Sequence, residues 1–369
     1  MKVAHVITGL GVGGAEVQLR LLLRELVGVR CEVVALTNAG EVAEGIRADG
    51  VGVTDLGMRG NRDLGVVPRL VRFIRAGRFD VVHTHLYRAC VYGRVAARLA
   101  GVRAVVATEH SLGDSQIEGR PLGAGTRALY RATERLGAGT AAVSTTVAER
   151  LRDWGVPADR IHLVPNGIDP APFRFDPAVR AAARRRLGLG RADYVVAGVG
   201  RLVPGKRFDR LVRAVAANPG TYLLLAGAGP ERGNVLRIAA QSGAADRVRI
   251  VGDADGGPGV PAVLAAADLF VSPSAEEAFG LAVVEALAAG LPVLYAACPA
   301  IEDLPPQDAP GACRTGGSAE EIAAAIGRQR AAGPVRLAVP AAVGHYHIAH
   351  TADRVMDLYA TALASARKK

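Results

Sequence analysis

Short apolar runs alternate with helix-length segments along most of this chain, and that alternation limits the fold more than any other feature. Runs that are apolar on both faces are typical of parallel strands covered by helices on both sides. In the first half the runs are VAHVIT, CEVVAL, VGVTDL, DVVHTH, AVVATEH, TAAVS and RIHLVPN, and in the second half they are YVVAGVG, TYLLLAG, VRIVG, LFVSPS and PVLYA.

The alternation of apolar runs and helix-length segments stops near residues 166–180, NGIDPAPFRFDPAVR, where proline recurs. With 369 residues, the chain is long enough for two domains of ordinary size. We therefore expect two doubly wound α/β domains, with boundaries near 1–170 and 171–346. Ligands of open parallel sheets bind beyond the carboxyl ends of the strands, so two such edges facing one another would form an interdomain cleft.

The composition bears on where the protein works and on whether its cysteines are reduced. No apolar run reaches 18 residues without a charge, and the N-terminal MKVAHVITGL resembles a first strand rather than a leader peptide. The four cysteines, at positions 31, 90, 298 and 313, form no C-x-x-C pair and have no metal-ligand spacing. These features predict a reduced, cytoplasmic protein.

The stretch SPSAEEAFGLAVVEALAAGLP at 272–292 combines two carboxylates with a helix start. Glu277 and Glu285 are separated by seven residues, and helix-forming residues follow Gly280. A helix N-terminus offers unpaired N–H groups and a positive dipole end to a phosphate. One carboxylate precedes that site, and the other lies about 12 Å further along if all eight steps are helical. A nucleotide sugar, with a diphosphate between two hydroxyl-bearing ends, has the matching shape.

Lysine is rare in this chain, which makes one lysine informative. Of 45 Lys and Arg residues only Lys2, Lys206, Lys368 and Lys369 are lysines. Lys206 follows an apolar run inside a Gly/Pro turn, five residues after Arg201. Both side chains could face one anionic group. The alternative interpretation is a solvated surface lysine.

Together these stretches carry a resemblance. In chain order the stretches are ITGLGVGGAE, FDVVHTH, VATEH, AVSTTVAERL, LVPNGIDPAPF, GVGRLVPGK, LLLAGAGP and ADLFVSPSAEEAFGLAVVEALAAGLPV. Taken together, they resemble the retaining glycosyltransferases of family 4. The resemblance covers nearly the whole chain and implies the GT-B fold, two Rossmann-like domains facing across a cleft. It also implies that residues 347–369 return to the N-terminal, acceptor-side domain, while 171–346 bind the donor.

Three departures from the family pattern stand out. The family usually has glycine after its lysine, where this chain has Arg207. The segment that is commonly Gly-rich is YAACPAIEDLPP at 295–306. The loop SLGDSQIEGRPLGAGTR at 111–127 matches no pattern tied to one substrate.

The resemblance also implies roles for individual residues. It places His110 beside the transferring sugar, Glu277 on the donor sugar hydroxyls and Glu285 on the ribose hydroxyls. The implied catalytic set is His110, Glu277, Arg201 and Lys206. The implied donor-binding set is Gly13, Gly14, Arg201, Lys206, Gly252, Asp253, Ala254, Asp255, Glu277, Ala278, Phe279, Gly280, Leu281 and Glu285. The acceptor-side candidates are His85, Tyr87, Arg88 and Arg59.

Two nucleotide-binding motifs are present only in part, because each lacks a residue that its function needs. Gly9, Gly11 and Gly14 satisfy G-x-G-x-x-G, but an NAD site needs an acidic residue at the end of the second strand, where this chain has Thr37-Asn38. Residues 200–206 nearly complete a Walker A loop, but Arg207 stands where Ser or Thr would hold magnesium.

Metal and glycosidase interpretations are also disfavoured. Asp253-Ala254-Asp255 matches D-x-D, yet two Asp residues in a turn are common, and Arg201 and Lys206 could neutralise phosphate without a metal. His83 and His85 point the same way on a strand, but no third zinc ligand has a recognisable spacing. A glycosidase carboxylate pair lies roughly 5–9.5 Å apart, less than the expected separation of Glu277 and Glu285. We expect no metal and no cofactor.

The sequence thus predicts a retaining hexosyltransferase that moves a sugar from a nucleoside diphosphate, with UDP preferred, to a hydroxyl of a small metabolite or natural-product scaffold. The alternatives are a GT-B nucleotide-sugar epimerase, a non-catalytic sugar-nucleotide sensor, and a transferase acting on lipid or polysaccharide at a membrane surface. The sequence offers no nucleophilic carboxylate suited to a double displacement.

Charge is concentrated in the first half. Residues 1–188 hold 27 Lys and Arg against 18 Asp and Glu, whereas 189–369 hold 18 against 17. One explanation of this excess is an arginine-rich composition with solvated helix faces, as at Arg69, Arg72, Arg75 and Arg78. An anionic acceptor or membrane steered by the positive field is the other explanation. We favour a soluble acceptor over peripheral membrane contact and expect no nucleic-acid partner.

Overall fold

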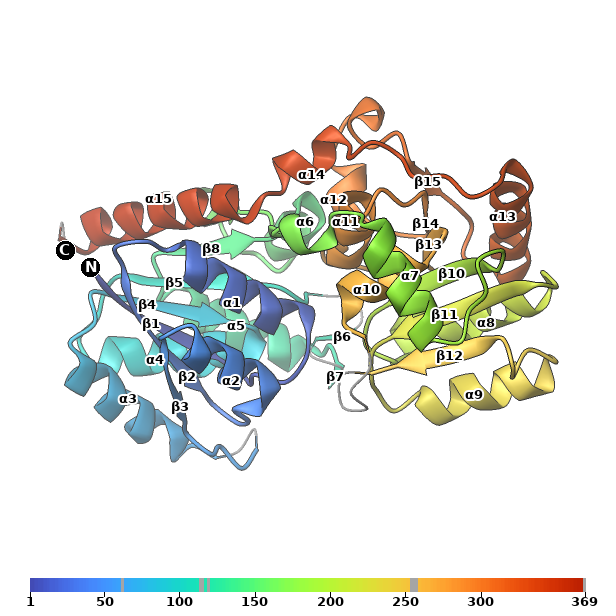
Figure 1. The fold of residues 1–369 in the computed structure, drawn as a ribbon. Coiled ribbons are helices and arrows are strands. Elements are labelled where there is room, and N and C mark those ends of the chain that lie inside the picture. Colours follow the sequence, from blue (N-terminus) through green and yellow to red (C-terminus); the bar gives the residue numbers. More distant parts are fainter. Residues whose placement is uncertain (61–62, 113–115, 118–119, 253–257, 368–369) are drawn as a thin grey trace. The chain divides into compact units, whose positions relative to one another are not determined.

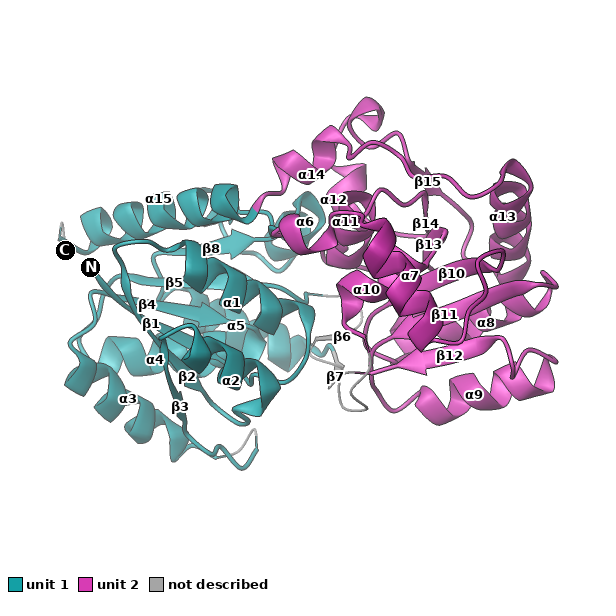
Figure 2. Ribbon diagram, in the orientation of Figure 1, with its two compact units in different colours: residues 1–167, 348–369 teal, residues 168–347 magenta. Residues whose placement is uncertain are grey.

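The structure is a computed structural model that describes residues 1–60, 63–112, 116–117, 120–252 and 258–367. It divides into two compact units, shown in Figure 2. Unit 1 comprises Met1–Gly167 and Ile348–Lys369, and unit 2 comprises Ile168–His347. Each unit is an α/β structure built on a parallel sheet (Figure 1).

In unit 1 the described residues form a seven-stranded parallel sheet with strand order β3-β2-β1-β4-β5-β8-β9. Its strands are β1 (Lys2–Ile7), β2 (Arg30–Ala35), β3 (Gly52–Asp55), β4 (Val81–His85), β5 (Val105–Glu109), β8 (Gly139–Ala142) and β9 (Ile161–Leu163). A separate antiparallel pair joins β6 (Gln116–Ile117) to β7 (Arg120–Pro121).

Helices cover both faces of this sheet. They are α1 (Gly14–Glu25), α2 (Gly40–Ala48), α3 (Val66–Gly77), α4 (Tyr87–Leu99), α5 (Ala124–Glu134), α6 (Thr145–Asp153) and α15 (Ile348–Arg367). Apolar side chains of α3 and α4 pack on one face, and those of α1, α2 and α15 pack on the other. Because successive strand residues point to opposite faces, Val6 faces α3 and α4 while its neighbour Ile7 faces α1 and α2.

In unit 2 the described residues form a six-stranded parallel sheet with strand order β12-β11-β10-β13-β14-β15. Its strands are β10 (Tyr194–Val199), β11 (Thr221–Ala226), β12 (Val248–Val251), β13 (Leu269–Ser272), β14 (Val293–Tyr295) and β15 (Ala312–Arg314). Its α-helices are α7 (Pro177–Arg186), α8 (Phe208–Ala216), α9 (Arg232–Gln241), α10 (Val260–Ala266), α11 (Leu281–Ala288), α12 (Pro299–Glu302), α13 (Ala319–Ala332) and α14 (Ala341–His345). Helices α8, α9 and α13 share one apolar core with the sheet.

All twelve apolar runs identified in the sequence form strands of these two sheets, which confirms the α/β prediction. Strand β15 was not predicted. Its three residues are half-buried or exposed at the edge of the unit 2 sheet, so they need no apolar run. A strand at an edge can remain polar because one side of it faces solvent.

Part of the arginine excess has a structural use in unit 2. Asp268 pairs with Arg180 at 2.5 Å and with Arg184 at 2.7 Å. The guanidinium groups of Arg180, Arg184 and Arg336 also donate hydrogen bonds to carbonyl groups at the end of α10. Planar guanidinium groups with several donors suit these unpaired carbonyl groups.

Candidate active site

The turn after β10 positions Lys206. The strand ends at Val199, the 3-10 turn Pro204–Lys206 follows, and α8 begins at Phe208. Glycine is required at Gly227 in the loop after β11, because a Cβ there would lie 2.1 Å from the carbonyl oxygen of Gly200. The two loops therefore approach each other backbone to backbone.

Arg207 stands where the family usually has glycine, and it adopts φ 52° at the N-terminus of α8. This left-handed conformation is uncommon for a residue with a Cβ. The chain thus keeps the backbone turn that glycine normally permits, with an arginine in its place.

Lys206 and Glu277 form a close ion pair. The Lys206 Nζ atom lies 2.5 Å from Glu277 Oε1, and the two side chains are 27% and 14% exposed. The lysine comes from the turn after β10 and the glutamate from the loop after β13, and these two strands are neighbours in the sheet. The partners, 71 residues apart, therefore meet at the carboxyl edge of the unit 2 sheet.

The loop carrying Glu277 is held in place around Gly280. Gly280 has φ 104° at the start of α11, and a Cβ there would lie 2.5 Å from Cys298 Sγ. The Phe279 carbonyl accepts hydrogen bonds from the Ala300 backbone N–H at 2.9 Å and the Cys298 thiol at 3.5 Å. The Phe279 ring packs edge-on against Tyr346, with ring centres 4.9 Å apart.

The residues that support this loop, namely Cys298, Ala300 and Tyr346, were not predicted from the sequence. Cys298 belongs to the segment that departs from the family's Gly-rich pattern, and that departure was the available signal for it. Hydrogen bonds from the backbone and the thiol of this segment hold the loop before α11. The N-terminus of α11, at Gly280 and Leu281, is the helix end suited to bind a phosphate.

Glu285 lies half-buried on α11 among apolar neighbours. Burial raises the pKa of its carboxyl group from 4.5 to about 7. A hydroxyl group that donates a hydrogen bond to this carboxylate would favour the ionised form. Glu285 is therefore suited to hold a polar ligand group and unfavourably placed as an ionised group without one.

The other predicted donor-side residues are placed as follows. Ala278 and Leu281 flank Phe279 and Gly280 and are half-buried. Arg201 is exposed after β10, and Gly252 is half-buried directly after β12. Asp253, Ala254 and Asp255 lie outside the described residues.

In unit 1, Gly13 and Gly14 lie at the start of α1, directly after the first loop. Gly13 is the N-cap in an extended conformation, and Gly14 is the first helical residue. A Cβ on Gly13 would lie 2.4 Å from Glu16 Oε2. The small residue thus lets the Glu16 carboxylate fold back toward the helix N-terminus, the favourable end for an anion.

Several acceptor-side candidates lie where β4 joins α4. His85 ends β4 and Tyr87 begins α4, and Leu86 between them has φ 72°. The Tyr87 hydroxyl donates to the Thr126 carbonyl at 3.1 Å, and Arg88 is half-buried beside it. Arg59 is exposed in the loop after β3.

His110 directly follows β5 and is half-buried. Its Nε2 atom lies 3.2 Å from Nδ1 of His85. Burial lowers the pKa of His110 to about 4, and the nearby Asn166 side chain partly opposes that shift. His110 is thus a neutral imidazole at physiological pH.

One reason used against a zinc site needs correction. The sequence offered no third ligand for His83 and His85, but the structure places His5 with them, each residue having a ring nitrogen within 4.8 Å of the others. His5 lies opposite His83 in the parallel pairing of β1 with β4. No spacing rule relates positions on two separate strands, so this cluster could not be found from the sequence.

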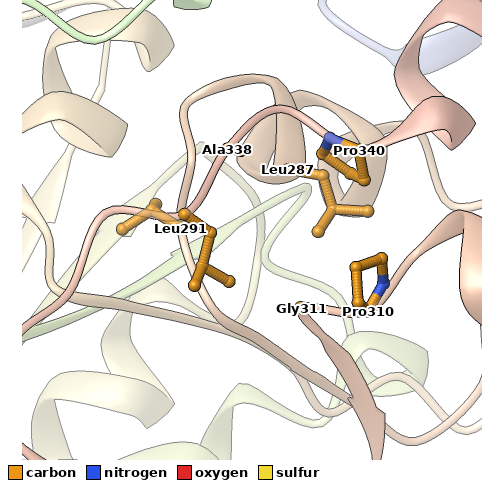
Figure 3. Close-up of a pocket in the computed structure, with 7 residues that line it drawn as sticks. Leu287, Leu291, Pro310, Gly311, Ala338 and Pro340 are labelled. Carbon is orange, nitrogen blue, oxygen red and sulfur yellow. The ribbon is translucent and has the colours of Figure 1, made fainter.

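A cavity of about 190 Å³ lies elsewhere in unit 2 (Figure 3). Its lining is Leu287, Leu291, Pro310, Gly311, Leu337, Ala338 and Pro340. No lining side chain can ionise or donate a hydrogen bond, so the cavity does not supply the chemistry of the candidate site. In the part of the chain that the structure describes, no helix is both long and apolar enough to cross a membrane.

The fold and comparisons with known proteins define the class. The structure matches the crystal structure of Anabaena Alr3699/HepE in complex with UDP and glucose at a TM-score of 0.82, over 97% of this chain and 98% of that chain, with 22% identity. Two parallel sheets with helices, with such a structural neighbour, define the GT-B fold.

The sequence comparisons then identify the family. Residues 12–172 match the model of Glycosyltransferase Family 4, and residues 179–329 match Glycosyl transferases group 1. The chain is 34% identical over 323 residues to the D-inositol 3-phosphate glycosyltransferase of Acidothermus cellulolyticus, covering 79% of this chain and 69% of that protein. The chain belongs to glycosyltransferase family 4.

Another relative matches over a smaller fraction of both chains. The D-inositol 3-phosphate glycosyltransferase of Salinispora arenicola is 34% identical over 252 residues, which cover 60% of this chain and 54% of that protein. The chain therefore spans about half the length of this relative, and substrates are a matter for proposal.

Proposed function

We propose that this glycosyltransferase moves a hexose from a UDP-linked donor to a hydroxyl group of a small anionic polyol, with retention of the anomeric configuration. The pairing of Lys206 with Glu277 beside the N-terminus of α11 is the observation that carries the proposal. It joins a cation suited to a diphosphate, a carboxylate suited to sugar hydroxyls and a helix end suited to a phosphate.

The leaving diphosphate gains charge as the sugar departs. Lys206, Arg201 and the backbone N–H groups at Gly280 and Leu281 would stabilise that charge without a metal ion. The backbone N–H groups at Gly280 and Leu281 are held before the reaction, because the Gly280 loop is bonded to the segment containing Cys298 and Ala300. Preorganised donors of this kind stabilise a transition state with little reorganisation.

The hydroxyl-bearing ends of the donor need acceptors and a fixed orientation. Glu285 would accept hydrogen bonds from the ribose hydroxyls, and Glu277 would accept them from the transferred sugar. His110 would orient the same sugar in its oxocarbenium-like state.

Retention is proposed to occur by attack on the same face of the sugar. The acceptor hydroxyl forms the new bond to the anomeric carbon as the bond to the diphosphate oxygen breaks, and its proton passes to that oxygen. Glu277 is engaged with Lys206 and Glu285 lies about one helical turn into α11, so neither is assigned as a nucleophile for a double displacement.

Support for the donor and acceptor classes comes from relatives and from charge. The Anabaena protein was crystallised with UDP and with UDP-glucose, and the bacterial relatives are named for D-inositol 3-phosphate. Residues 1–167 and 348–369, which form unit 1, hold 26 Lys and Arg against 18 Asp and Glu. A positive field attracts an anionic acceptor.

The test begins with thermal shifts measured for UDP-, GDP- and ADP-linked sugars. We expect UDP-sugars to raise Tm most, because binding to the folded state stabilises it. Transfer is then assayed with inositol 3-phosphate and with unphosphorylated inositol, with and without EDTA. Transfer to the phosphorylated polyol in EDTA, with the donor's anomeric configuration seen by NMR, supports the proposal. An inverted product, a strict need for a divalent metal, or donor turnover without any acceptor would contradict it.

A further inference from the structure

Four histidines gather on one face of the unit 1 sheet, and three of them form a hydrogen-bonded chain. Nδ1 of His5 lies 3.1 Å from Nε2 of His85. Nδ1 of His85 lies 3.2 Å from Nε2 of His110. One ring nitrogen remains at each end, Nε2 of His5 and Nδ1 of His110, and both are buried with no hydrogen-bond partner among the described residues.

The fourth histidine is outside this chain. His83 Nδ1 lies 2.7 Å from the Tyr359 hydroxyl of α15, and His83 Nε2 lies 2.7 Å from the Thr108 hydroxyl of β5. Both of its ring nitrogens are therefore occupied. His83 shares the strand and the burial of His85 but makes no hydrogen bond to His110, which makes it a matched control.

All three imidazoles of the chain are neutral at physiological pH. Burial lowers the pKa of His5 to about 3 and that of His110 to about 4. Burial, followed by the neighbouring histidines, holds the pKa of His85 well below its usual range. A neutral imidazole has one N–H and one bare nitrogen, so the chain has only two complete hydrogen-bonded arrangements. The spare hydrogen is either on His110 Nδ1 or on His5 Nε2.

Both end nitrogen atoms are buried, but the two end residues of the chain differ in exposure and position. His5 is fully buried on the sheet face covered by α1 and α15, so no ligand reaches its Nε2 atom. His110 is half-buried directly beyond the carboxyl end of β5, the edge where parallel sheets bind ligands. A buried N–H without an acceptor costs about 1–3 kcal/mol. That cost is avoided when the spare hydrogen is at His110 and an oxygen atom accepts it.

We propose that His5 and His85 are positioning residues that hold His110 as the tautomer with its hydrogen on Nδ1, so that His110 donates a hydrogen bond to an oxygen of the transferred sugar. The identity of that oxygen rests on the proposed function, whereas the tautomer does not. The chain does not conduct protons to solvent, because its far end at His5 is closed.

A metal ion is the competing use of these residues. Zinc binds neutral histidine through a bare nitrogen at about 2.0–2.1 Å. His83 has no nitrogen to spare, and the facing nitrogens of His5 and His85 bond to each other. The described side chains therefore fit a hydrogen-bonded chain better than a metal site.

The direct test is side-chain ¹⁵N NMR of the full-length, ¹⁵N-histidine-labelled protein without ligand. We expect His110 to show a protonated Nδ1 and a bare Nε2. His85→Leu should shift His110 to the other tautomer or to a mixture, whereas His85→Asn, whose amide can donate in place of Nδ1, should retain the original pattern. His83→Gln should leave the pattern unchanged, although it also removes a buried imidazole. If His85→Leu does not fold, His5→Leu, which removes only the far partner, should still produce a mixture.

Activity supplies the second readout. We expect kcat to fall roughly tenfold in His85→Leu, an effect typical of losing a residue that orients a functional group, with recovery in His85→Asn. A protonated Nε2 on His110 in the wild type would overturn the inference. So would an unchanged tautomer in both His85→Leu and His5→Leu, an equal change in His83→Gln, or one zinc ion per chain by elemental analysis. Absence of glycosyl transfer with every donor would instead contradict the proposed function and leave the NMR result standing.

Discussion

The Lys206 ammonium group lies 2.5 Å from a carboxylate oxygen of Glu277, so the cation proposed for the donor diphosphate is already paired in the free protein. In the proposed function a diphosphate would share or replace this partner, and Glu277 would reorient toward the sugar. The contact of Lys206 with the phosphate would then release the Glu277 carboxylate to accept hydrogen bonds from the sugar hydroxyls.

Glu277→Gln is expected to bind UDP more tightly while losing turnover. The substitution removes a negative charge beside the diphosphate and releases Lys206. A partly exposed ion pair contributes up to about 1 kcal/mol, which corresponds to up to about fivefold tighter binding. Isothermal titration with UDP measures the affinity, and a transfer assay measures kcat. UDP binding weaker than in the wild type would show that the carboxylate does not compete with the diphosphate.

Lys206→Ala is expected to weaken UDP binding by at least about 30-fold, because removing one partner of a partly buried charge pair typically costs 2 kcal/mol or more. Lys2→Ala is the matched control: it breaks a lysine–glutamate pair of similar length, 2.8 Å to Glu32, in unit 1. The control should leave UDP affinity unchanged. Near-normal turnover of Lys206→Ala would contradict the proposal that Lys206 binds the donor diphosphate.

Glu285 is expected to make stability fall as pH rises. Its folded pKa, about 7, lies above the ordinary value of 4.5, so between these two values the folded state retains a proton that the unfolded state has lost. Stability therefore decreases across roughly pH 4.5–7. Glu285→Gln should flatten this part of the Tm–pH profile, whereas Glu320→Gln on the exposed side of α13 should not. UDP should restore stability most near and above pH 7, where it engages the ionised carboxylate. Identical profiles for the wild type and Glu285→Gln would contradict the raised pKa.

Asp268→Ala is expected to destabilise unit 2 by about 3–5 kcal/mol, since it leaves the buried guanidinium group of Arg184 and the half-buried one of Arg180 without their carboxylate partner. Asp49 offers a matched control: it also pairs with two arginines, Arg20 at 2.6 Å and Arg24 at 2.8 Å, but on the exposed surface of unit 1. Asp49→Ala should cost at most about 1 kcal/mol. Urea unfolding measures both, and equal effects would show that burial of the Asp268 pair adds nothing.

Local pattern was enough to predict the architecture. Each strand of a parallel sheet covered on both faces must be apolar, and this requirement marks the strand in its own residues, as in Tyr194–Val199. The helix start at Gly280 was equally visible, because a strand, a glycine and a helix-forming run follow in order. Lys206 stood out by its rarity and by its position in a Gly/Pro turn after an apolar run. The edge strand β15 escaped prediction because an edge does not demand an apolar run.

Tertiary structure decided which distant side chains meet. His5 and His85, 80 residues apart, are joined because β1 and β4 pair in parallel, and Lys206 meets Glu277 because β10 and β13 are neighbours. Cys298 supports Gly280 for a similar reason, since β13 and β14 lie side by side. The alternation of apolar runs determines that strands form and that helices cover them. Strand order and register are set by packing of the whole sheet, so the sequence alone predicted the elements and the fold determined the contacts between them.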